Sequence, residues 1–85
     1  MALDIAYFAW VRERMGMAAE TIELPSGIAT VGDLVGWLAA RNERGARAFA
    51  EPARIRAAID GDMVAPTALI AHAREVALFP PVTGG

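Results

Sequence analysis

Hydrophobic and polar residues alternate with a period of two in several short stretches, which is typical of β-strands with one buried face. In residues 3–9, Phe8 falls on the face opposite the core-facing side chains, so we expect it to be exposed. Asp60-Gly61 is a strong signal for a tight hairpin turn. The pattern predicts five strands, at residues 3–9, 20–24, 54–59, 63–64 and 75–79.

A helical repeat lies between the second and third strands. Thr30 and Asp33 fit a capping box, in which each side chain accepts a bond from the backbone N–H of the other residue. The apolar residues that follow have helical spacing and predict one buried stripe: Val31, Leu34, Val35 and Leu38. Gly36 inside this helix indicates close packing against the sheet, and Gly45 marks the end of the helix.

Shorter helical segments are also expected. Residues 11–15 predict a single turn closed by Gly16, and residues 46–53 predict a short helix that ends before Pro52 and is anchored by Phe49. Residues 66–73 predict a loop with a helical turn at 69–70. The fold class is therefore α+β: one sheet of four to five strands with one main helix across one face. The other face must stay in water or meet a partner.

The composition limits the function. The 85 residues carry no cysteine, and all eight basic residues are arginine, so the chain has no thiol nucleophile and no side-chain amine. A net charge of −2 with scattered arginines makes nucleic acid an unexpected partner. No apolar run suits a membrane span, which favours a cytoplasmic protein. His72, in a polar loop, and the turn residues Asp60 and Asp62 predict no catalytic or metal site.

The chain divides into a domain at residues 1–79 and an extended tail at residues 80–85. Pro80 and Pro81 end the last strand and stiffen the tail, which can reach roughly 20 Å at about 3.3 Å per residue. Gly84 and Gly85 have no side chains and can enter a narrow channel. Since no catalytic cluster exists elsewhere in the sequence, the Gly85 carboxylate is the candidate reactive group.

A docking surface is expected beside this tail. Phe8 and Phe79 are both in phase with the face away from the core, where together they would form an apolar patch. Arg12 and Glu13 lie close to Phe8 in the sequence and could pair with charges across an interface.

The chain resembles the small subunits of molybdopterin synthase, the MoaD type of ubiquitin-like sulfur carrier with a β-grasp fold. The resemblance covers the length and element order of the chain. It rests on the stretch 7–13, on Ala58-Ile59-Asp60-Gly61, and above all on the ending Phe79-Pro80-Pro81-Val82-Thr83-Gly84-Gly85. Position 60 is aspartate where such proteins often have asparagine.

The resemblance implies a mechanism. An activating enzyme of the MoeB type adenylates Gly85 with ATP, a persulfide converts it to a thiocarboxylate, and no cofactor is bound by the chain itself. The tail then threads into the large subunit, of the MoaE type, through Pro80, Pro81, Val82, Thr83 and Gly84. There the sulfur is donated to cyclic pyranopterin monophosphate for molybdenum cofactor biosynthesis. Catalytic groups are expected on the large subunit, with which the family forms a heterotetramer.

Other functions remain open. The chain could carry sulfur for thiamine thiazole, as the ThiS type does, or for tRNA thiolation. It could be a ubiquitin-like protein modifier or a β-grasp binding module without sulfur chemistry, or an unrelated binding domain whose terminal diglycine is accidental.

Overall fold

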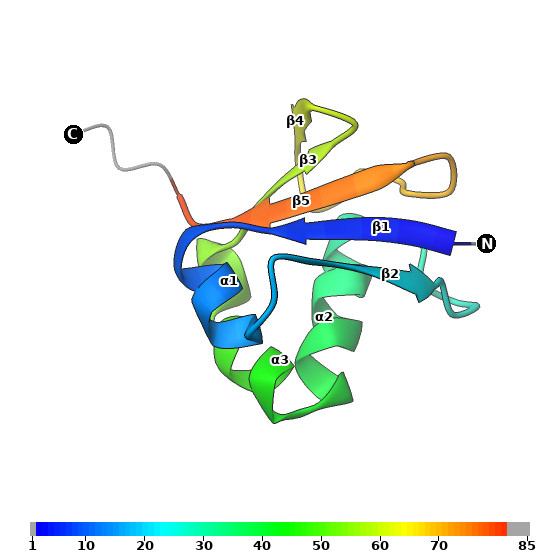
Figure 1. Ribbon diagram of the computed structural model, residues 1–85. Coiled ribbons are helices and arrows are strands. Elements are labelled where there is room, and N and C mark those ends of the chain that lie inside the picture. The colour runs from blue at the N-terminus through cyan, green and yellow to red at the C-terminus, as the bar shows by residue number, and fades with distance from the viewer. Residues whose placement is uncertain (1, 82–85) are drawn as a thin grey trace.

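A single mixed sheet forms the centre of the protein (Figure 1). The computed structural model describes residues 2–81. Strand β1 pairs in parallel with β5, and the other neighbouring pairs are antiparallel, in the order β2-β1-β5-β3-β4. The strands are β1 (Ala2–Tyr7), β2 (Ala19–Glu23), β3 (Arg56–Ile59), β4 (Asp62–Val64) and β5 (Glu75–Phe79). The predicted α+β class is confirmed and all five strands are present, but the third begins at Arg56 and not at residue 54.

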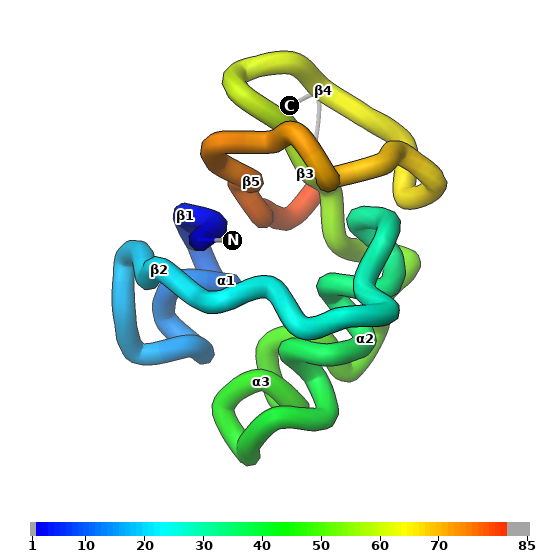
Figure 2. The backbone as a smooth tube through the Cα atoms, turned by 90° about the vertical axis from the view of Figure 1, so that its right-hand side faces the viewer, coloured from blue at the N-terminus to red at the C-terminus, as the bar shows by residue number. Residues whose placement is uncertain are grey.

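Helices cover only one face of this sheet, as Figures 1 and 2 show from two directions. They are α1 (Ala9–Met15), α2 (Val31–Arg41), α3 (Glu43–Ala48) and the 3₁₀-helix η1 (Pro52–Arg54). Helix α2 is the longest, and its predicted capping box and buried stripe are both present. The expectation of one main helix is incomplete, because α1 and α3 also contribute buried residues to the core.

The first strand is shorter than residues 3–9. It ends at Tyr7, and Phe8 becomes the residue before α1. Ala9 takes a left-handed φ of 53°, which a strand cannot continue through. Helix α1 then ends at Gly16, whose φ of 75° and bond from its N–H to the Arg12 carbonyl match the predicted closing turn.

The region after α2 also differs from the prediction. The Asn42 side chain accepts a hydrogen bond of 2.8 Å from the Gly45 N–H, so α3 begins at Glu43 and Gly45 lies inside it. Helix α3 stops at Ala48, and Pro52 opens η1, so residues 46–53 are not one helix. Phe49 is buried, as expected, and its ring lies 6.4 Å from that of Tyr7.

The loop before β5 is held by backbone contacts. Leu69 forms an isolated bridge with Thr30, so the helical turn predicted at 69–70 is wrong. The N–H groups of Val31 and Gly32, at the start of α2, donate to the carbonyls of Ala68 and Pro66. The loop thereby satisfies donors that a helix start leaves open.

Candidate functional site

The tail continues from the middle strand of the sheet. Strand β5 lies between β1 and β3 and is hydrogen-bonded on both sides. It ends at Phe79, and Pro80 and Pro81 follow as partly exposed residues without regular structure. The predicted threading and reactive residues Val82, Thr83, Gly84 and Gly85 lie outside the described residues. Because β5 is hydrogen-bonded on both sides, the point where it ends is fixed to the body of the protein.

Phe8 and Phe79 come together beside this point. Both lie one position beyond the Tyr7–Leu78 pair of the parallel strands, and the Phe8 N–H donates to the Leu78 carbonyl at 3.1 Å. Tyr7 and Leu78 face the core, so the following residues face the side without helices. Phe8 is 48% exposed and Phe79 is partly buried. The predicted position of both on the outer face is confirmed.

Small residues continue this face across the sheet. The strand register aligns one residue from each strand in a row: Ala19, Ala6, Ala77, Ala58 and Met63. Met63, at the edge, is 64% exposed. The outer face thus has an aromatic end at the tail, a flat alanine row, and a polar end at Thr21, Asp4 and Glu75.

Arg12 and Glu13 lie on α1 and are both exposed, while Val11 and Met15 of the same helix are buried. Because α1 begins immediately after Phe8, these charges lie at the same end of the sheet as the tail. The structure therefore brings the partner-binding residues predicted from the sequence to one end of the molecule.

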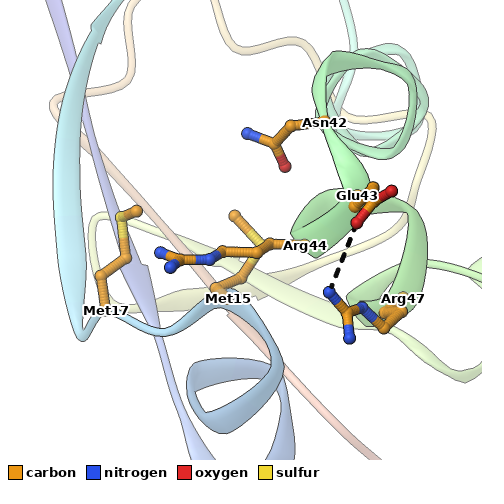
Figure 3. Close-up of a pocket in the computed structure, with 6 residues that line it drawn as sticks. All are labelled: Met15, Met17, Asn42, Glu43, Arg44 and Arg47. Carbon is orange, nitrogen blue, oxygen red and sulfur yellow. Dashed lines mark ion pairs between the residues drawn. The ribbon is translucent and has the colours of Figure 1, made fainter.

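A hollow lies between α1 and α3 (Figure 3). It has a volume of about 340 Å³ and is lined by Met15, Met17, Asn42, Glu43, Arg44 and Arg47. Arg44 extends between the two methionines, and Arg47 turns toward Glu43.

A charged network was missed by the sequence reasoning. The Tyr7 hydroxyl donates to Glu20 at 2.7 Å, and Arg41 donates two bonds to the same carboxylate at 2.9 and 2.7 Å. The alternation in β2 contained the signal, since Glu20 is in phase with the buried Ile22. The bonds from Arg41 lower the pKa of Glu20. Burial, followed by the bond to Glu20, raises the pKa of Tyr7.

Asp60 has a structural role. Its carboxylate accepts bonds from the N–H groups of Arg74 and Glu75, at 3.1 and 2.9 Å. These bonds join the β3–β4 turn to the start of β5. Among residues 2–81, no helix is long and apolar enough to cross a bilayer.

The fold and the terminal diglycine define a ubiquitin-like β-grasp protein, and comparisons with known proteins agree. A putative molybdopterin converting factor, subunit 1, from Pyrococcus furiosus has a TM-score of 0.75 and 30% identity, covering 96% of this chain and 99% of that one. Small archaeal modifier protein 1 from Haloferax volcanii has a TM-score of 0.71 and 26% identity, with 95% and 98% covered.

The sequence comparisons give the family. Residues 5–85 match the model of the ThiS family. The molybdopterin synthase sulfur carrier subunit of Escherichia coli (strain K12) is 35% identical over 83 residues, which are 98% of this chain and 99% of that protein. The chain belongs to the ThiS family, and the resemblance to ubiquitin-like sulfur carriers is confirmed.

Proposed function

We propose that this protein is the sulfur carrier subunit of a molybdopterin synthase. The observation that carries the proposal is the ending Phe79-Pro80-Pro81-Val82-Thr83-Gly84-Gly85, which continues from a strand bonded on both sides. The full-length similarity to the Escherichia coli sulfur carrier subunit supports it. The tail supplies the reacting atom, and the folded body presents it.

The chemistry takes place at the Gly85 carboxylate. A carboxylate is a poor electrophile, so an activating enzyme of the MoeB type first joins it to AMP from ATP and releases pyrophosphate. A persulfide then attacks the acyl carbon and displaces AMP, and reduction of the resulting acyl disulfide by a thiol leaves the thiocarboxylate. The chain has no cysteine of its own, so the persulfide must come from another protein.

The thiocarboxylate is then used in the large subunit. Phe8 and Phe79 dock on a subunit of the MoaE type, with Arg12 and Glu13 at the rim, and the tail enters the active site through Pro80, Pro81, Val82, Thr83 and Gly84. Sulfur is transferred there to cyclic pyranopterin monophosphate. The catalytic acid, base and cation belong to the large subunit, and the two subunits form a heterotetramer in the cytoplasm.

A second function is a protein modifier. The similarity to small archaeal modifier protein 1 favours it. In that case the activated Gly85 would form an amide with a lysine of another protein. The acceptor cannot be a lysine of this chain, because all eight of its basic residues are arginine.

The test is to incubate the thiocarboxylated chain with the large subunit and cyclic pyranopterin monophosphate, and to measure molybdopterin. We expect product from the native chain and none from a chain lacking Gly85 or extended by one residue, with unchanged circular dichroism in all three. Formation of a thiazole instead would support the thiamine pathway, and amide-linked conjugates would support the modifier. Full activity of the extended chain would contradict a role for the terminus.

A further inference from the structure

The charges of this protein are separated along the direction of β5. Arginines that are scattered in the sequence gather in the fold near the end where β5 stops, because α1 and the start of β3 lie there and α3 packs against α1 (Figure 1). We name this the arginine end, and it consists of Arg12, Arg14, Arg44, Arg47, Arg54 and Arg56, with the carboxylates of Glu13, Glu43 and Glu51 among them. Its side chains therefore carry a net charge of +3.

The opposite end is acidic. It holds six carboxylates and Arg74, a net charge of −5, near the starts of β1 and β5, the end of β2 and the β3–β4 turn. We name it the acidic end: Asp4, Glu23, Asp33, Asp60, Asp62 and Glu75. Between the two ends, Glu20 and Arg41 neutralise each other as an ion pair of 2.7 Å. The overall charge of −2 thus hides a strong dipole.

Contacts join three of these arginines, Arg14, Arg47 and Arg54, to one another. The guanidinium carbon of Arg14 lies 4.3 Å from the centre of the Trp10 ring, and that of Arg54 lies 5.7 Å from it, both within range of a cation–π attraction. Arg14 also donates to the Arg47 carbonyl at 3.5 Å, which links α1 to α3. The Trp10 ring therefore holds two positive charges, one from α1 and one from η1.

The acidic residues nearby do not cancel this field. Arg47 pairs with Glu43, and Arg54 with Glu51, each at 3.9 Å. The two arginine side chains are 70% and 56% exposed, so these are weak surface pairs. The surface stays positive around the place where the chain leaves β5: η1 directly precedes β3, whose first residue, Arg56, is paired with Phe79.

We propose that the arginine end steers the protein, tail first, onto an acidic rim around the entrance of the protein that receives the tail. This inference rests on the proposed function, and it adds the charge of the partner and the way the two proteins meet. A dipole aligned with β5, the strand from which the tail continues, turns the molecule before contact and raises the rate of productive encounter. A protein partner is favoured because the arginine end is continuous with the apolar patch of Phe8 and Phe79.

The test compares two variants with the same change in net charge. Arg47→Gln/Arg54→Gln removes two charges from the arginine end, and Arg74→Glu changes the charge equally at the acidic end. Association with the MoeB-type enzyme and the MoaE-type subunit of the same organism is followed by stopped-flow fluorescence at several salt concentrations. We expect the double variant to associate about tenfold more slowly than the native chain at low salt. At high salt, where the charges are screened, the two rates should converge. Arg74→Glu should associate at nearly the native rate.

Equal rates and equal salt dependence for the native chain and the double variant with both partners would overturn the inference, even if the thiocarboxylate forms normally. A double variant that loses affinity for a duplex DNA oligonucleotide while keeping its partner association rates would also overturn it. The order of elution from a sulfonate cation exchanger at pH 7 and low salt tests the arginine end without any partner. The double variant should elute before Arg74→Glu, which has the same net charge, even if no variant forms a thiocarboxylate and the proposed function fails.

Discussion

Two glycines in neighbouring helices have opposite surroundings. A Cβ added to Gly45 would overlap the carbonyl oxygen of Leu38 at the end of α2, whereas a Cβ on Gly36 would meet no atom within 4 Å. The close packing expected at Gly36 is therefore found at Gly45. Sequence spacing alone could not separate them, because the contact depends on the sharp turn at Asn42 between α2 and α3.

Alanine substitution at these two glycines should change the free energy of unfolding in opposite directions. Gly45→Ala should destabilise the protein by about 2 kcal/mol, because the backbone of α2 must move. Gly36→Ala should stabilise it by about 1 kcal/mol, since alanine favours a helix and has space there. Urea unfolding followed by circular dichroism measures both. A similar loss of stability in the two variants would show that the packing at Gly45 is not special.

Phe8 should matter for binding and little for folding. Phe8 is 48% exposed and lies outside the core, so Phe8→Ser leaves the core intact and removes the centre of the proposed docking patch. We expect affinity for the MoaE-type subunit to fall by about 2 kcal/mol, or about 30-fold, as measured by calorimetry. Leu69→Ser is the matched control, because Leu69 is 73% exposed in the loop before β5. If both variants bind alike, the patch is not the docking surface.

At the scale of elements, one charged network fastens the edge strand β2. Glu20 of β2 accepts bonds from Tyr7 of β1 and from Arg41 at the end of α2. Arg41 also lies 5.1 Å from the Trp37 ring, which packs against the core. The network thereby joins two strands and a helix at the place where β2 has no further strand beside it.

The network should make stability depend on pH. The pKa of Glu20 is lowered in the folded state from its ordinary value of 4.5. The carboxylate therefore adds stability above pH 4.5, and this contribution disappears as the pH falls through the folded pKa. Glu20→Gln should cost about 2 kcal/mol at pH 7, and the difference from the native chain should shrink below pH 4.5. Unfolding curves across this range test it, and a difference independent of pH would contradict it.

The sequence predicted the elements better than their limits. Alternation, β-forming residues and the Asp60-Gly61 turn located the five strands, and Thr30 with Asp33 located the start of α2, because these signals are local. The end of β1 at Tyr7 could not be read, since it depends on the left-handed backbone of Ala9. Leu69 was misread as helical because its partner, Thr30, lies 39 positions earlier in the chain. The common location of the arginines could likewise not be predicted from the sequence, because it depends on how the elements pack together.

At the scale of the whole molecule, the sheet serves as an anchor for its own last strand. Strand β5 is bonded to β1 and β3, and the apolar patch, α1 and the arginine end all lie around its final residue, Phe79. Phe8 and Phe79 could be assigned to the outer face from the sequence, but their position side by side depends on the parallel pairing of β1 with β5. The folded domain thus holds the apolar patch of Phe8 and Phe79 beside the point where the chain leaves β5.

If Gly85 carries the sulfur, the mass of the intact chain must change when the chain is loaded. The native protein is incubated with a MoeB-type activating enzyme, ATP and a persulfide donor, and then analysed by mass spectrometry with fragmentation of the C-terminus. We expect a mass gain equal to the replacement of one oxygen by one sulfur, located at Gly85. An unchanged mass, with an enzyme and donor that thiocarboxylate another carrier in parallel, would contradict it.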